Sequence, residues 1–280
     1  MTCKLMCGDC IEKMQEIPDR SVDMILCDPP YGTTRNKWDV VIPFHSSVEF
    51  NGIVYSEHDF KSLFTPENKK EMLSYWKDHH NPGMWEQFCR IAKDNAAIVV
   101  FGSGMFTANC MVSAPKGMWR YNLIWEKTTP TGFYNAKKMP LRSHEDIMVF
   151  YKRPPTYNPQ MSHGHKRKVS LAAHKKNCRV STDYGSAPAT SYDSTDRYPK
   201  SVWKFKTDKQ TCAIHPTQKP VLLCEELILT YTNKGDTVFD PTFGSGTTGV
   251  ACAKTQRNFI GIEQGITEYS LGARRIEDAF

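Results

Sequence analysis

The chain has 280 residues, of which 40% are hydrophobic and 24% are charged, so we expect a packed core and exclude collagen-like and disordered chains. No run approaches the roughly 18 to 20 apolar residues of a membrane span, and the first residues lack the apolar core of a signal peptide. The net charge of +6 is modest, and on its own it only hints at a polyanionic partner.

These features predict a cytoplasmic protein without a membrane partner, in which the ten cysteines are reduced thiols. Cys7 and Cys10 form one CxxC pair, but no second pair follows at zinc-finger spacing. His163, His165, His174 and Cys178 also fit no common finger. The sequence therefore predicts no metal site.

The first elements alternate between strand and helix. The apolar run from Val22 to Cys27, between PDRS and DPPYG, predicts a short buried parallel strand. Residues 83–93 place Met84, Trp85, Phe88 and Ile91 on one face of a helix, and NAAIVVFG over 95–102 predicts a second strand.

Later elements continue this pattern. Two runs, 121–126 and 145–151, predict an antiparallel pair, and VLLCEELILTYT predicts a helix with Pro220 near its start. Residues 236–240, a glycine-rich loop, a helix to about Thr255 and a strand over 258–263 form a βαβ unit. Such alternation favours an α/β fold whose sheet carries helices on both faces.

Two long segments interrupt the alternation, and each is interpreted as a functional insertion. Residues 45–81 are polar and aromatic, with a possible hairpin at Asn51 and Gly52. Residues 153–206 are rich in Tyr, Ser and Pro, and the stretch 152–209 holds thirteen Lys and Arg residues against four Asp. We therefore expect one domain, formed by 1–152 and 207–280, that carries both insertions.

The stretch DPTFGSGTTG, residues 240–249, predicts a ligand loop. Glycines between a strand and a helix permit a sharp turn and close approach of a ligand, and the helix N-terminus offers free N–H groups. The spacing is neither GxGxxG nor a P-loop. Glu263 ends the next strand, where an acidic residue binds ribose hydroxyls. These features favour a nucleoside without a pyrophosphate; a plain strand-to-helix turn is the alternative.

The DPPY stretch, residues 28–31, predicts a rigid array of acceptors. Two prolines fix φ and donate no N–H, which leaves the Asp28 carboxylate and the Pro29 carbonyl free to accept. Two acceptors drawing on the hydrogens of an exocyclic amino group would free its lone pair for attack on a methyl group, without a cysteine nucleophile. Tyr31 would stack on a base that has swung out of a duplex. A strand-ending turn is the alternative.

With these motifs the sequence resembles the amino-group DNA methyltransferases that use S-adenosyl-L-methionine. DPPY is similar to their catalytic motif and DPTFGSGTTG to their FxGxG motif. DPPY comes first and HPTQKP, 215–220, leads into the glycine loop, an order that resembles the β class. The resemblance covers about 1–43, 83–152 and 207–280, and it implies a circularly permuted, Rossmann-like methyltransferase sheet.

The resemblance also implies roles for individual residues. Asp28 and Pro29 would hold the amino group, Tyr31 would stack on the base, and Pro30 completes the catalytic motif. Glu263 would bind the ribose. The implied cofactor residues are Asp9, Cys10, Asp28, Thr217, Gln218, Lys219, Asp240, Phe243, Gly244, Ser245, Gly246, Thr247 and Glu263.

The basic segment 153–206 is the predicted target recognition region for double-stranded DNA, because its cations can neutralise phosphates. The cations predicted to bind DNA are Lys166, Arg167, Lys168, Lys175, Lys176 and Arg179. Lys37, Trp38 and Asp39 are candidates for closing the pocket, and 45–81 is a candidate lid, DNA clamp or subunit contact. A homodimer is plausible, since dimers are frequent in the β class.

The sequence thus predicts an adenine-N6 DNA methyltransferase. DPPY resembles the adenine members, whereas cytosine-N4 members more often carry serine in place of the aspartate. A protein glutamine methyltransferase is a weaker alternative, because there the glycine loop precedes an NPPY motif. An inactive DNA-binding partner subunit is a third alternative, although such a subunit would not need Asp28.

Overall fold

The computed structural model describes residues 1–171, 180–181, 185–186, 191–207 and 218–280. The chain forms two compact units, one made of Met1–Asn158 with Ser201–Phe280 and the other of Pro159–Lys200. Within the described residues, no helix is long and apolar enough to cross a membrane.

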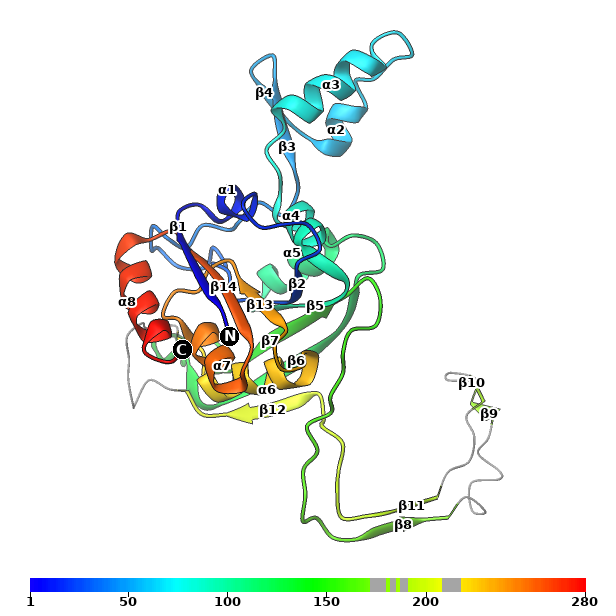
Figure 1. Cartoon of the computed structure of the whole chain (residues 1–280), viewed down its shortest axis with the longest axis vertical. Coiled ribbons are helices and arrows are strands. Elements are labelled where there is room, and N and C mark those ends of the chain that lie inside the picture. Colours follow the sequence, from blue (N-terminus) through cyan, green and yellow to red (C-terminus); the bar gives the residue numbers. More distant parts are fainter. Residues whose placement is uncertain (172–179, 182–184, 187–190, 208–217) are drawn as a thin grey trace. The chain divides into compact units, whose positions relative to one another are not determined.

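An eight-stranded sheet forms the centre of the larger unit (Figure 1). Seven strands run in one direction, and β7 is antiparallel to both of its neighbours. The predicted antiparallel pair is confirmed as β6 and β7. The order across the sheet is β1 (Cys3–Cys7), β14 (Asn258–Glu263), β13 (Thr237–Asp240), β2 (Val22–Cys27), β5 (Ala92–Gly102), β7 (Arg142–Phe150), β6 (Trp119–Thr131) and β12 (Val202–Phe205).

Helices cover both faces of this sheet, as predicted (Figure 1). One hydrophobic cluster joins the sheet to α1 (Cys10–Met14), α4 (Met84–Ile91) and α5 (Met105–Ser113). The other joins it to α6 (Val221–Tyr231), α7 (Thr247–Thr255) and α8 (Ile266–Glu277). Strand β2 serves both clusters, with Met24 and Leu26 in one and Ile25 and Cys27 in the other. Side chains alternate along a strand, so an apolar run is buried on both faces.

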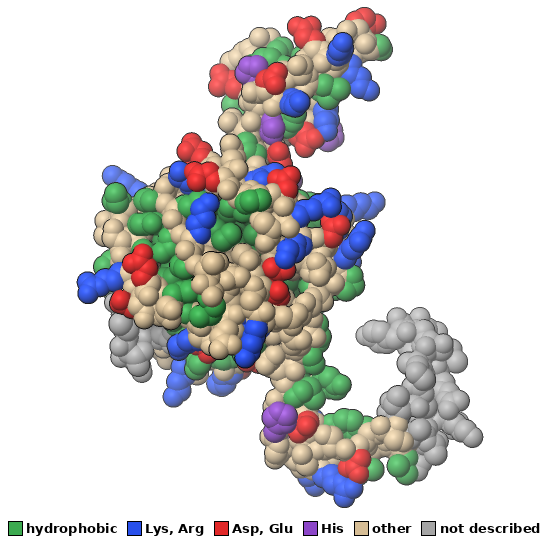
Figure 2. Space-filling view, in the orientation of Figure 1, with side chains coloured by type: hydrophobic (Ala, Val, Ile, Leu, Met, Phe, Trp, Pro, Cys, Tyr) green, Lys and Arg blue, Asp and Glu red, His purple; other side chains and the backbone are tan. Residues whose placement is uncertain are grey.

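The insertion after the DPPY loop has its own small core. Strands β3 (Ser47–Phe50) and β4 (Ile53–Ser56) form the predicted hairpin, and α2 (Glu57–Lys61) and α3 (Lys69–His79) follow. Val48, Phe60 and Met72 are buried together. Its sequence holds six Asp and Glu residues and four lysines, and Figure 2 shows both charges interspersed over its visible face.

The smaller unit consists of short paired strands. Strand β8 (Lys168–Ser170) pairs with β11 (Tyr192–Ser194), and β9 (Val180–Ser181) pairs with β10 (Gly185–Ser186), both antiparallel. The Ser162 N–H and the Arg197 N–H each donate to the other residue's carbonyl, which closes the base of this unit. The unit lies within the segment predicted for target recognition.

Candidate functional site

The predicted motifs meet at one edge of the sheet. Strands β1, β14, β13 and β2 are parallel neighbours, so the loops after their carboxyl ends lie side by side. Asp9, Glu263, the glycine loop and DPPY occupy these four positions. They line a cavity of about 1190 Å³, which is larger than most pockets for a single small ligand.

Most of the cofactor and catalytic residues predicted from the sequence line this cavity. Gly246 is not among the lining residues, and Thr217 lies outside the described residues. The predicted residues that line the cavity are Asp9, Cys10, Asp28, Pro29, Pro30, Tyr31, Gln218, Lys219, Asp240, Phe243, Gly244, Ser245, Thr247 and Glu263.

The glycine loop is shaped by two left-handed glycines with different roles. Gly244 has φ +48°, and its N–H donates to Glu263 Oε2 at 2.9 Å, which ties the loop to the end of β14. The Gly265 N–H donates to Glu263 Oε1 at 2.9 Å, so both oxygens of this carboxylate are fixed. Gly246 has φ +79°, and a Cβ there would lie 2.7 Å from the Gly272 carbonyl in α8. Gly246 therefore allows the loop to pack against α8.

The Asp28 carboxylate accepts hydrogen bonds from two side chains, Tyr31 and Lys219. The Tyr31 hydroxyl donates to Oδ1 at 2.9 Å. Lys219 Nζ donates to Oδ1 at 2.6 Å and to Oδ2 at 2.7 Å. The Tyr31 ring also lies 5.0 Å from the ring of Phe106. Lys219 was predicted to lie beside the cofactor, and the structure places its ammonium group on the DPPY carboxylate.

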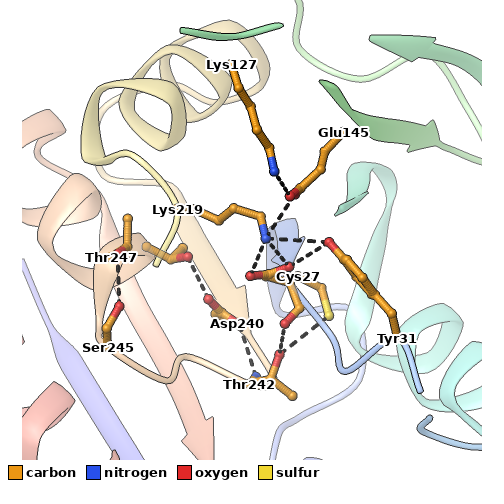
Figure 3. Close-up of polar contacts among 11 residues, drawn as sticks. Cys27, Tyr31, Lys127, Glu145, Lys219, Asp240, Thr242, Ser245 and Thr247 are labelled. Atoms are coloured by element: carbon orange, nitrogen blue, oxygen red, sulfur yellow. Dashed lines mark hydrogen bonds and ion pairs between the residues drawn. The ribbon is translucent and has the colours of Figure 1, made fainter. Parts of the chain in front are cut away.

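A buried chain of charges continues from Lys219 (Figure 3). Glu145 Oε2 lies 3.2 Å from Lys219 Nζ, and Lys127 Nζ donates to Glu145 Oε1 at 2.5 Å. The four side chains alternate in sign, and Lys219, Lys127 and Glu145 are only 8%, 8% and 13% exposed. Buried charges are stable only when they are paired in this way.

Burial and pairing oppose each other in this chain. Burial disfavours the charged form of Lys219, but Asp28 and Glu145 outweigh it and raise its pKa to about 12. Burial would raise the pKa of Glu145, but Lys219 and Lys127 lower it below its usual value. Burial raises the pKa of Asp28, and Lys219 offsets only part of this effect.

Other polar groups fix the loops around the cavity. Asp39 accepts from the N–H groups of Gly32, Thr33 and Thr34 at 2.8, 2.8 and 2.6 Å, so it organises the chain after DPPY. Asp9 Oδ1 accepts from the Ile11 N–H at 2.8 Å and caps α1. Burial would raise the pKa of Asp39, but its hydrogen bonds lower it overall.

The family model described as DNA methylase matches residues 22–273, which is most of the chain. This chain belongs to the DNA methylase family. It is a site-specific DNA methyltransferase of the group that methylates N6 or N4 amino groups. A curated relative, the Type II methyltransferase M2.MboI of Moraxella bovis, is 27% identical over 277 residues, which cover 97% of this chain and 86% of the relative.

Two solved structures share the fold of this DNA methylase. The M1.HpyAVI–SAM complex has a TM-score of 0.56 at 19% identity, covering 98% of this chain and 99% of the other. The cytosine-N4-specific PvuII DNA methyltransferase has a TM-score of 0.58 at 13% identity, covering 100% and 91%. The Rossmann-like methyltransferase fold predicted from the sequence is thereby confirmed.

The rim of the DNA methylase cavity includes a loop that the sequence analysis did not single out. Thr131, Gly132 and Arg142 line the cavity, and the loop between β6 and β7 joins them. Phe133 and Tyr134, in the short helix η1 (Phe133–Asn135), are 81% and 104% exposed. The next residues include the exposed cations Lys137 and Lys138. Exposed aromatic and basic side chains therefore share one loop, and both ends of this loop line the cavity.

The cations nominated for DNA binding lie in the smaller unit. Arg167 makes two hydrogen bonds with Asp193, at 2.7 and 2.6 Å, and both side chains are exposed. Lys166 and Lys168 are exposed. Lys175, Lys176 and Arg179 lie outside the described residues. Across the described ranges, no group of three or more His, Cys, Asp and Glu side chains is placed to hold a metal ion.

Proposed function

We propose that this DNA methylase transfers a methyl group to the N6 amino group of adenine in duplex DNA, by base flipping and direct transfer. S-adenosyl-L-methionine is the methyl donor. The observation that carries the proposal is that one cavity is lined by both the glycine loop and the Asp28 carboxylate.

The glycine-loop end of the cavity suits the cofactor. Gly244, Ser245 and Thr247 would surround its methionine part, with Glu263 at the ribose and Asp9 and Cys10 at the adenine. The cavity is large enough to take a nucleoside and a target base together. When bound, S-adenosyl-L-methionine supplies an electrophilic methyl carbon and leaves as a neutral thioether.

The DPPY end suits an exocyclic amino group. Asp28 and the Pro29 carbonyl would each accept one of its hydrogens, which makes the nitrogen lone pair available. The nitrogen gains a methyl group and gives up one proton, which the Asp28 carboxylate would accept. Tyr31 contributes a ring for stacking, and a base reaches such a cavity only when it leaves the duplex.

Direct transfer agrees with the state of the thiols beside the cavity. Burial raises the pKa of Cys10 to about 12 and that of Cys27 well above its usual value. Both thiols are therefore protonated at neutral pH and are poor nucleophiles. Attack by the base amino group needs no covalent enzyme intermediate.

Adenine is favoured over cytosine by the aspartate of DPPY. The resemblance of DPPY to the adenine-N6 members supports this choice, because cytosine-N4 members more often have serine there. Adenine N6 and cytosine N4 are both exocyclic amino groups, so the acceptor chemistry alone accommodates either base.

The test is transfer of labelled methyl from S-adenosyl-L-methionine to duplex DNA, followed by digestion to nucleosides. We expect label in N6-methyladenine. Label in N4-methylcytosine would change the base, label in protein would point to a glutamine methyltransferase, and label nowhere would indicate an inactive subunit. The Asp28→Ala variant tests the role of the carboxylate. Methyl transfer should be abolished, while cofactor affinity measured by calorimetry stays within about threefold of the wild-type value.

A further inference from the structure

Lys219 stands where the target amino group is expected. Its ammonium group donates to both oxygens of Asp28, at 2.6 and 2.7 Å. Tyr31 donates to the same carboxylate at 2.9 Å. A carboxylate offers about four lone-pair sites, and three are engaged by these contacts. Its negative charge is also paired with the cation, which weakens its pull on another hydrogen-bond donor.

Glu145 is a second carboxylate that the ammonium group of Lys219 can bind. Its Oε2 lies 3.2 Å from Lys219 Nζ, but the geometry forms no hydrogen bond, and this buried oxygen has no hydrogen-bond partner among the described residues. Its other oxygen is anchored by Lys127 at 2.5 Å. A buried acceptor left unsatisfied is unfavourable, so a small movement of Lys219 towards Glu145 would gain a hydrogen bond.

We propose that Lys219 and Glu145 are positioning residues: the ammonium group of Lys219 binds Asp28 in the free enzyme and moves to Glu145 when the target amino group binds Asp28. This inference rests on the proposed function. The movement keeps the ammonium group paired, because Glu145 replaces Asp28 as its partner and the target amino group takes its place at Asp28. It also exposes the full negative charge of Asp28 only after the base has arrived.

The charges that face Asp28 come from several elements. Lys219 precedes α6, Glu145 lies in β7, Lys127 in β6, Tyr31 after β2, and Asp240 ends β13. Cys27 is also adjacent, as a neutral thiol. Among these groups, Lys219 is the cation that contacts the Asp28 carboxylate, and its positive charge favours the ionised form of Asp28. As it moves away, Asp28 becomes a better acceptor for the proton that the amino nitrogen releases.

The first test uses Glu145→Gln, which keeps the shape of Glu145 and removes its charge. The probe is duplex DNA with 2-aminopurine at the methylated position, whose fluorescence rises when the base leaves the stack. In the Glu145→Gln variant, the ammonium group of Lys219 has no carboxylate to move to. If it then leaves Asp28 in only about a tenth of the molecules, the apparent affinity for the flipped base is about tenfold weaker than in the wild type. Cofactor affinity, measured by calorimetry without DNA, should stay within about twofold of wild type.

The second test uses the pH profile of single-turnover methylation. Lys219→Met should move the acid limb of the profile to higher pH, because burial of Asp28 is then no longer offset by a cation. Lys219→Arg keeps the charge and should leave the limb in place. The matched control is Lys254→Met, which removes the exposed partner of Glu225 at 3.1 Å and should change neither readout.

If the Glu145→Gln variant flips the base and methylates DNA as well as the wild type does, the inference is overturned and the proposed function stays intact. Failure of the wild type itself to methylate DNA would overturn the proposed function instead. Should Glu145→Gln fail to fold, a structure of the wild type with a flipped base decides the question. Lys219 Nζ should then bind Glu145 Oε2, and an ammonium group still on both oxygens of Asp28 would refute the switch.

Discussion

The hydroxyl of Thr242 donates a hydrogen bond of 3.1 Å to the backbone carbonyl of Asp28. Thr242 belongs to the loop after β13, and Asp28 belongs to the loop after the neighbouring strand β2. The same hydroxyl lies 3.8 Å from Cys27 Sγ. One side chain therefore couples the loop predicted to bind the cofactor to the loop that presents the acceptor carboxylate.

Thr242→Val should slow methyl transfer more than it weakens cofactor binding. Valine keeps the shape but removes the donor, at a cost of about 1 kcal/mol in the free energy of unfolding. Because the transfer depends on close alignment, we expect the single-turnover rate to fall about tenfold, while the cofactor dissociation constant changes less than about threefold. Rapid-quench kinetics and calorimetry measure the two quantities.

Thr230→Val is the control for this substitution. The Thr230 hydroxyl donates to the Glu226 carbonyl within α6 at 2.7 Å, away from both loops. It should produce a similar or smaller loss of stability with no change in rate. Equal rates in the two variants would mean that the Thr242 bond does not couple the loops.

Gly246→Ala should destabilise the fold through a clash with α8. The new Cβ would lie 2.7 Å from the Gly272 carbonyl and 2.9 Å from Ile276 Cγ1. Gly117 has a similar φ of +76°, and a Cβ there would meet no described atom within 4 Å. Gly117→Ala therefore reports the backbone strain alone. We expect Gly246→Ala to lose about 1 to 3 kcal/mol more than Gly117→Ala in chemical denaturation, and equal losses would contradict the clash.

Asp240 should make the folded protein less stable as pH rises. Burial raises its pKa from 3.8 to about 7, although the Thr248 hydroxyl and the Thr242 N–H donate to it. Between these values the folded protein holds a proton that the unfolded chain has released. The free energy of unfolding therefore falls as pH rises from about 4 to about 7, by at most about 4 kcal/mol.

Asp240→Asn removes this titration, so its free energy of unfolding should change less with pH over that window. Denaturant unfolding at several pH values measures the difference between the two curves. Asp278→Asn, at an exposed position after α8, is the control and should reproduce the wild-type curve. A curve for Asp240→Asn that runs parallel to wild type would exclude Asp240 as the source.

The sequence predicted the strands that carry the motifs because they are buried on both faces. The apolar runs of β2 and β14 end at turn residues, and their predicted limits, 22–27 and 258–263, agree with the structure. Strands β1 and β12 lie at the two edges of the sheet and were missed. They are short and partly exposed, so their residues show no continuous apolar run.

The buried charge chain was harder to predict from sequence. Lys127 and Glu145 come from neighbouring antiparallel strands, and Lys219 comes from the segment before α6. No local spacing brings these residues together, because their contact depends on the order of strands in the sheet. The available signal was the pair of carboxylates, Glu145 and Asp146, directly before the apolar run 147–151. Glu145 lines the cavity.

The loop between β6 and β7 provides the last prediction. Lys137 and Lys138 are exposed in the same loop as Phe133 and Tyr134, and the ends of this loop line the cavity that a flipped base must enter. Replacing both lysines with glutamine should weaken DNA binding and reduce the slope of log affinity against log salt by about two, because each phosphate that is no longer neutralised lowers the slope by about 0.9. Fluorescence anisotropy with labelled duplex at several salt concentrations measures this slope.

Lys69 and Lys70 are the matched control, because they are also adjacent exposed lysines but lie at the start of α3 in the mixed-charge insertion. Their replacement with glutamine lowers the net charge of the chain by the same amount. If the rim lysines contact phosphates, only the Lys137/Lys138 variant changes the slope. If binding depended on net charge alone, both variants would weaken it equally, and the loop would have no direct contact with the duplex.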